Sequence, residues 1–315
     1  MEAAPKSKGA EDIFPPFTPD GLRRDVELIL RDNDIDKADP TLSPAERRTL
    51  ADRYVAQVDV SRRAAFRYAH ERGFSQEKIA LAATIYGGEI VRARIWSDPD
   101  KCMQDLTNAR EAVDWQNNAV EYILATNELQ GSKAYETLKS FWANQNKLMH
   151  PFINGGRAES KLAHYQNGIL RPVALLHALR TCNEWDAAAP PDPDDDALNK
   201  IDAVAQSKRG INFVFQIKPQ SPEETRPVTL LPVLPGAAPR SSPKLMPFWQ
   251  GMAAFGRKYG IEDSRLVGVY VQISMNGIDP TTGMPQPEIA QYIREQTEAL
   301  DARIAGNIDN SSMVA

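Results

Sequence analysis

The side chains of this 315-residue chain that suit catalytic or metal chemistry are few and widely spaced. None of the four histidines (His70, His150, His164 and His177) has the spacing of zinc ligands. The acidic run Asp192, Asp194, Asp195 and Asp196 offers oxygen ligands for calcium, but it lacks the glycine and the distal glutamate of an EF-hand loop. The chain has no Gly-x-Ser-x-Gly motif, P-loop or dinucleotide fingerprint. We therefore predict no metal site and no cofactor.

A local excess of arginine is the clearest charge feature of the chain, whose net charge is -5. Residues 41–95 hold ten Lys/Arg against six Asp/Glu, and nine of the ten are arginine. Guanidinium groups pair well with phosphates, so this segment fits contact with a nucleic acid. A solvated helix face explains the same excess, and both interpretations stay open at this point.

Residues 64–96 resemble the helix-turn-helix of the phage-repressor family. The matching positions are Gly73, Ser75, Gln76, Glu77, Ile79, Ala80, Ala83, Ile85 and Ile90. In that family two helices cross steeply around a turn, here at Thr84, and the second helix enters the major groove. The resemblance implies nucleic-acid contacts, which we predict from Arg62, Arg63, Arg67, Gln76, Arg92 and Arg94. The alternative is a helix pair with a purely structural role.

The segment HPFINGGR, residues 150–157, resembles the Fic motif of AMP-transferring enzymes. In that family the histidine is the general base, and the glycine-rich loop and its arginine bind phosphates. The resemblance implies His150 as the base, Gly155 and Gly156 as an anion-binding pair, and Arg157 as a phosphate ligand. The family's acidic position is Asn154 here, and the loop is one residue shorter, which also fits an inactive relative or a plain turn between helices.

Helical periodicity dominates the first 185 residues. A capping box with proline at the first helical position starts one helix at Ser43. Ser75 starts another, which we expect to break at Gly87 and Gly88. Further amphipathic helices follow. These patterns predict a helical domain.

Beyond it, the composition changes where proline and aspartate predict a stiff linker. Apolar residues then alternate in residues 211–217 and 267–275, as in strands, and a helix follows that we expect to stop at Gly306. Between those strands, a proline-rich segment is expected to be extended. We predict a mainly α fold with a flexible arm (1–20), a helical domain (21–186), a Pro/Asp linker (187–199), a small Pro-rich α+β region with a short sheet (200–306) and a flexible tail (307–315).

The sequence argues against a membrane-spanning protein and against a conventional secretory signal. The chain has no run of about 18 apolar residues, so we expect no membrane-spanning helix. Cys102 and Cys182 match no ligand spacing and suit buried free thiols in the cytoplasm or another reducing compartment. The first residues lack the apolar stretch of a secretory signal, which leaves unconventional export open.

The sequence alone therefore predicts a non-enzymatic helical binding protein. Its best specific partner is a nucleic acid, bound by the Arg-rich helices of a regulator or of a nucleocapsid-like packaging protein. One alternative is a protein-only assembly or host-interaction factor that self-associates through its terminal arms and Pro-rich segment. The other alternative is a degenerate Fic-type AMP transferase.

Overall fold

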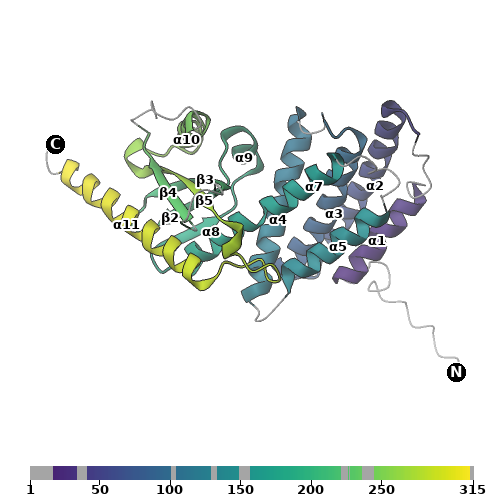
Figure 1. Cartoon of the computed structure of the whole chain (residues 1–315), viewed down its shortest axis with the longest axis horizontal. Coiled ribbons are helices and arrows are strands. Elements are labelled where there is room, and N and C mark those ends of the chain that lie inside the picture. Colours follow the sequence, from purple (N-terminus) through teal and green to yellow (C-terminus); the bar gives the residue numbers. More distant parts are fainter. Residues whose placement is uncertain are drawn as a thin grey trace, which may run out of the picture. The chain divides into compact units, whose positions relative to one another are not determined.

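The computed structural model of the protein describes residues 17–33, 41–100, 104–128, 133–148, 157–220, 226, 228–235 and 245–312. Its helices are α1 (Pro19–Asp32), α2 (Pro44–Glu71), α3 (Gln76–Ser97), α4 (Leu106–Glu128), α5 (Ala134–Leu148), α7 (Arg157–Gly168), α8 (Leu170–Arg180), α9 (Pro193–Asn199), α10 (Met246–Tyr259) and α11 (Pro287–Ser312). Its strands are β1 (Trp185–Ala189), β2 (Ala203–Ser207), β3 (Asn212–Pro219), β4 (Val228–Val233) and β5 (Leu266–Ile273). The predicted fold class, mainly α with a smaller α+β region, is confirmed (Figure 1).

The chain forms two compact units. Unit 1 comprises Met1–Ala125 and Thr137–Ala163, and unit 2 comprises Thr126–Glu136 and His164–Ala315. None of the helices in the described ranges combines the length and the apolar character that a bilayer crossing requires.

Unit 1 is helical, and its α2 and α3 pack side by side (Figure 1). The predicted capping box is present, because Ser43 N donates to the Glu46 carboxylate at 2.8 Å and Ser43 Oγ accepts from Glu46 N. The break predicted within α3 is wrong, since one helix runs from Gln76 to Ser97. Gly87 and Gly88 instead allow close packing: a Cβ on Gly88 would lie 3.1 Å from the indole Nε1 of Trp115.

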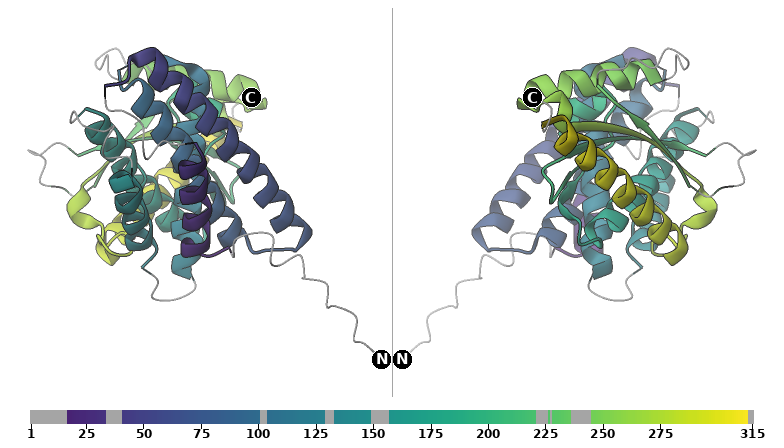
Figure 2. Two further views of the ribbon diagram at one scale, coloured as in Figure 1. Left: turned by 90° about the vertical axis from the view of Figure 1, so that its right-hand side faces the viewer. Right: turned by 90° about the vertical axis from the view of Figure 1, so that its left-hand side faces the viewer.

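Unit 2 is built on a five-stranded sheet in the order β1-β2-β3-β5-β4. β3 and β5 are parallel, and the other neighbours are antiparallel. Helices α9 and α10 lie on one face of the sheet, and α8 and α11 lie on the other (Figure 1). Figure 2 shows α11, in yellow, lying across the strands. The two predicted strands are confirmed as β3 and β5, whereas β1, β2 and β4 were not predicted.

Residues 187–199 differ from the linker that their composition predicts. Ala187–Ala189 belong to the edge strand β1, and the proline and aspartates start helix α9. Asp192 is the N-cap, and its side chain accepts from Asp194 N at 2.8 Å. The proline sits at the first helical position, where a missing N–H costs nothing. A run that looks solvated by composition is therefore an ordered helix start.

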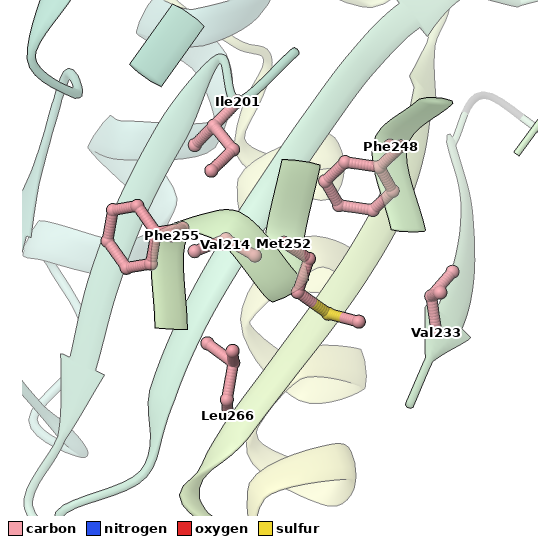
Figure 3. Packing of buried hydrophobic residues seen from close by; sticks show 7 residues of the cluster. All are labelled: Ile201, Val214, Val233, Phe248, Met252, Phe255 and Leu266. Atoms are coloured by element: carbon pink, nitrogen blue, oxygen red, sulfur yellow. The ribbon is translucent and has the colours of Figure 1, made fainter. Parts of the chain in front are cut away.

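The α10 face of the sheet carries an apolar cluster (Figure 3). It contains Ile201, Val214, Val233, Phe248, Met252, Phe255 and Leu266. Two glycines allow the layers to approach. A Cβ on Gly268 of β5 would lie 2.7 Å from Met252 Sδ, and a Cβ on Gly251 of α10 would lie 1.9 Å from the carbonyl oxygen of Asn199. Helix α10 thus lies in direct backbone contact with the end of α9.

A tight turn in unit 2 holds the segment where α4 ends and α5 begins. The Asp279 carboxylate accepts from Thr281 N at 2.7 Å and Thr282 N at 2.9 Å, which lowers the pKa of this carboxyl. The carbonyl of Thr281 accepts from Glu136 N at 3.0 Å, and that of Thr282 accepts from Asn127 Nδ2 at 3.1 Å. Asn127 and Glu136 are thereby attached to a turn about 150 positions later in the chain.

The predicted arms differ from the structure at their inner ends. Residues 1–16 lie outside the described residues, but α1 begins at Pro19, and Phe17 is buried with its ring 4.9 Å from that of Phe74. At the other end, α11 continues through Gly306 to Ser312, so the predicted helix stop is wrong.

Substituting Gly251 tests the contact between α9 and α10. We expect Gly251→Ala to lower the free energy of unfolding by about 1–3 kcal/mol, because its new methyl group overlaps the Asn199 carbonyl. The control is Gly306→Ala in α11, where nothing lies within 4 Å and alanine favours the helix, so stability should hold or rise. Urea denaturation followed by circular dichroism measures both; equal stability of the two variants would contradict the contact.

Candidate active site

Polar side chains gather on the α10 face of the sheet at the carboxyl ends of its two parallel strands. Side chains alternate along β3, so Gln216 and Lys218 share the face of Val214, which lies in the α10 cluster. The register pairs Gln216 with Tyr270 and Lys218 with Gln272 on β5. Ligands of open α/β sheets bind at this edge of parallel strands.

Asp202, immediately before β2, lies against the same part of β3. Its backbone N donates to the carbonyl of Phe215 at 2.7 Å, and its carboxylate accepts from Ile217 N at 2.5 Å. The ammonium of Lys218 lies 3.9 Å from that carboxylate. The Asp202 side chain is 21% exposed and that of Lys218 is 41% exposed, so both reach solvent.

A second carboxyl, that of Asp196 on α9, is electrostatically coupled to Asp202. Burial raises the pKa of both carboxyls, and the charge of Asp202 raises the pKa of Asp196 further, to about 8. Lys218 and Lys200 lower both pKa values without cancelling the increase. Burial of Asp196 and the nearby charge of Asp202 both disfavour a second negative charge, so near neutral pH the pair retains a proton.

Two neighbouring polar side chains lack partners. Gln216 is only 5% exposed, and its carboxamide has no hydrogen bond to any described residue. The pKa of the Tyr270 hydroxyl is raised by burial and then by the charge of Asp202, so this phenol stays protonated. The Gln216 carboxamide borders solvent, where water or a ligand can complete its hydrogen bonds. We call Asp196, Asp202, Gln216, Lys218 and Tyr270 the strand-end site.

The backbone is strained beside this site. Lys200, at the C-cap of α9, has φ 58° and ψ 38° and is the non-glycine residue with positive φ among those the structure describes. This left-handed conformation costs about 1 kcal/mol in a residue with a side chain. Glycine would avoid that cost, but it would also remove a cation within electrostatic reach of both carboxyls.

The acidic run does not converge on one ion. Asp195 is 1% exposed and accepts from Lys258 Nζ at 3.0 Å and from the Tyr259 hydroxyl at 2.8 Å, whereas Asp196 belongs to the strand-end site. Within the described ranges, no three His, Cys, Asp or Glu side chains form a metal-binding group. A cation at the strand-end site would therefore have two carboxylate ligands, with its other ligands from Gln216, water or substrate.

The side chains predicted to contact nucleic acid differ in their surroundings: some form ion pairs, some are exposed and one is buried. Asp59 forms ion pairs with Arg62, at 2.7 Å, and with Arg63. Arg94 pairs with Asp52, and Arg67 and Gln76 are exposed on α2 and α3. The prediction for Arg92 is corrected, since its side chain is 2% exposed and pairs with the fully buried Glu89, out of reach of a phosphate.

The helix-turn-helix geometry is not formed in the predicted place. Thr84 and the two glycines that follow are buried inside the continuous helix α3, so no turn separates two helices there. Thr84 Oγ1 donates to the carbonyl of Ala80 at 2.8 Å, as a mid-helix threonine does. The contacts that the resemblance implies stay predictions for the exposed side chains alone.

The Fic-like segment is only partly described. His150, Gly155 and Gly156 lie outside the described residues, and Arg157 is the first residue of α7. The self-association predicted for the arms and the Pro-rich segment also stays a prediction.

We compared the chain with known protein families, with curated proteins and with solved structures, and none of the three comparisons finds a match.

Sequence reasoning missed every residue of this site except Asp196, which it placed in a linker. One signal was present. Gln216 and Lys218 interrupt the apolar run that begins at Phe213 and stand two positions apart, so they must share a face of the strand. Nothing in the sequence around Asp202 indicates a site, because only the pairing of β2 with β3 brings Asp202 close to Gln216 and Lys218.

The buried ion pair of unit 1 can be tested directly. Replacing Arg92 by Met leaves Glu89, which also accepts from the Tyr54 hydroxyl at 2.9 Å, without its cation. We expect a loss of about 3–5 kcal/mol in unfolding free energy. The control Arg63→Ala breaks an exposed pair and should leave stability unchanged. Chemical denaturation measures both, and equal effects would argue against the buried pair.

The shared proton predicts how stability depends on pH. Between about pH 4 and pH 8 the folded carboxyl pair binds more protons than the unfolded chain, so unfolding free energy falls as pH rises, by at most about 1.4 kcal/mol per pH unit. Asp196→Asn removes this titration, so its stability relative to the parent should increase from pH 5 to pH 8. The exposed Asp186→Asn is the control. Parallel pH curves for parent and Asp196→Asn, from urea titrations, would contradict the shared proton.

Proposed function

We propose that unit 2 is a divalent-cation-dependent phosphodiesterase that acts on nucleic acid through the strand-end site. The observation that carries the proposal is the arrangement of two electrostatically coupled carboxyls, Asp196 and Asp202, with the Lys218 ammonium 3.9 Å from Asp202. Titratable residues whose pKa values are strongly shifted by burial and a charged neighbour are enriched at functional sites. Their place at the carboxyl ends of parallel strands supports the same conclusion.

The donor set fits a hard cation such as Mg²⁺ or Mn²⁺. Such ions bind to one or two carboxylates and complete their coordination with water and substrate oxygens. A double positive charge in place of the shared proton would relieve the repulsion between Asp196 and Asp202. The unpartnered Gln216 carboxamide offers a neutral oxygen next to them. When bound, such a cation supplies Lewis-acid stabilisation of phosphoryl charge and lowers the pKa of its water.

The neighbouring side chains suit a phosphodiester. Lys218 and Lys200 hold positive charge at the edge of the site, where an ammonium can pair with a phosphate oxygen. Tyr270, kept protonated by burial and by the Asp202 charge, can donate a hydrogen bond to a phosphoryl oxygen or to a leaving group. Asp202 is held in place by Ile217 N, which limits its freedom to reorient.

A nucleic acid is also a partner that suits the exposed arginines of unit 1. Arg67 and Arg72 of unit 1 are exposed and have no acidic partner among the described residues. They offer non-specific contacts to a phosphate backbone. This proposal keeps the partner predicted from the sequence and adds a catalytic activity that the sequence did not predict.

Hydrolysis by the purified full chain tests the proposal. We expect Mg²⁺ or Mn²⁺ to support cleavage of double-stranded DNA, single-stranded DNA or RNA, and EDTA to stop it. Asp202→Asn and Lys218→Gln should each lower the rate at least about 100-fold, as loss of a charge-stabilising group does. The matched control Asp186→Asn removes a carboxylate from the same unit and should leave the rate unchanged.

Cation affinity provides a second readout that does not depend on the substrate. Because the cation displaces the shared proton, Mn²⁺ affinity should rise with pH between pH 5 and pH 8, by up to about tenfold per unit. Calorimetry measures it for parent and Asp202→Asn. The proposal fails if the parent binds no Mn²⁺, or if Asp202→Asn cleaves as fast as the parent.

A further inference from the structure

An open groove lies on the α10 face of the sheet over β1 and β2. Its volume is about 430 Å³, within the range of small-ligand pockets. The register aligns Ala187 with Gln206 and Ala189 with Val204, so these side chains form the floor. Phe255 and Tyr259 of α10 form the wall. We call this pocket the β1–β2 groove.

Small side chains and the position of α10 leave this space open. The apolar cluster joins α10 to β3, β4 and β5, and Phe255 lies at the opposite end of that cluster from Val233 (Figure 3). Over β1 the floor consists of alanines, whose methyl groups fill little of the space. Tyr259 is 49% exposed, and its ring lies 4.6 Å from that of Phe255. The wall therefore presents aromatic surface to the groove.

The polar end of the groove is a pair of carboxamides. Gln206 Nε2 donates to Asn212 Oδ1 at 3.3 Å, and the Gln206 carboxamide oxygen has no partner among the described residues. Carboxamides offer a donor and an acceptor in one plane, which is how Asn and Gln recognise the edge of a base. Aromatic rings next to such groups stack on bases. This combination fits a planar heterocycle with a hydrogen-bonding edge.

We propose that the β1–β2 groove binds a nucleobase, preferably a purine. Asp202, immediately before β2, shares a face with Val204 and Gln206 of β2 at steps of about 7 Å, so a base over Val204 would lie close to a phosphate at the strand-end site. The inference rests on the proposed function, because a nucleic-acid substrate is what would bring the base to the groove. The groove would then hold a nucleotide next to the bond that is cut.

An added peptide strand is the competing occupant of β1, and one contact disfavours it. Arg180 Nε donates to the carbonyl of Ala188 at 2.8 Å, so this carbonyl of the edge strand already has a partner. A peptide pairing with β1 would need such groups free.

Binding of adenosine, AMP and a single-purine oligothymidylate to the full chain in EDTA tests the groove. We expect measurable binding, weakened at least about tenfold by Ala187→Leu, which fills the floor, and by Gln206→Leu, which removes the polar edge. The control Asp186→Leu places the same side chain on β1 outside the groove lining and should bind as the parent does. Circular dichroism and melting temperature check that each variant is folded.

The outcomes separate the groove from the strand-end site. Asp202→Asn should bind adenosine as the parent does, because the floor and wall are unchanged. If adenosine and AMP bind but no cation-dependent cleavage occurs, the groove stands and the proposed function fails. If neither nucleoside nor oligonucleotide binds, or if Ala187→Leu leaves their binding unchanged, the groove inference is overturned whatever the cleavage assay shows.

Discussion

Parallel pairing of β3 with β5 requires the chain to leave the sheet and return in the same direction, and in unit 2 this crossover contains β4 and α10. The pairing therefore determines where α10 lies, and α10 in turn covers the first half of both strands with its apolar residues. The second half of the same face carries Gln216, Lys218 and Tyr270. One strand pair thus separates an apolar core from a polar site along its own length.

Much of the fold could be predicted because periodicity is a local property. The capping box at Ser43 and the alternation in β3 and β5 reflect interactions between residues close in sequence, and the structure confirms them. The break predicted at Gly87 and Gly88 was wrong for the opposite reason, since what these glycines accommodate is Trp115 of α4. The role of a glycine in a helix depends on the neighbour that packs against it.

The candidate site could not be predicted in the same way. Asp196 was assigned to a linker because its neighbours are proline and aspartate, and its significance comes from a carboxyl six positions later that is also next to β3. Charge counting was equally misleading for Arg92, whose partner Glu89 holds it inside unit 1. Formal charge in a sequence does not distinguish a surface cation from one neutralised in the interior.

The attachment of Asn127 and Glu136 to the turn at Asp279 gives the chain an unusual connectivity. The polypeptide passes between the two units three times, after Ala125, after Glu136 and after Ala163, so neither unit is a continuous stretch. A ribosome releases residues 126–136 long before it synthesises the turn that binds them. Unit 2 therefore cannot complete its structure until nearly the whole chain has emerged, and no single cleavage of the backbone yields both units intact.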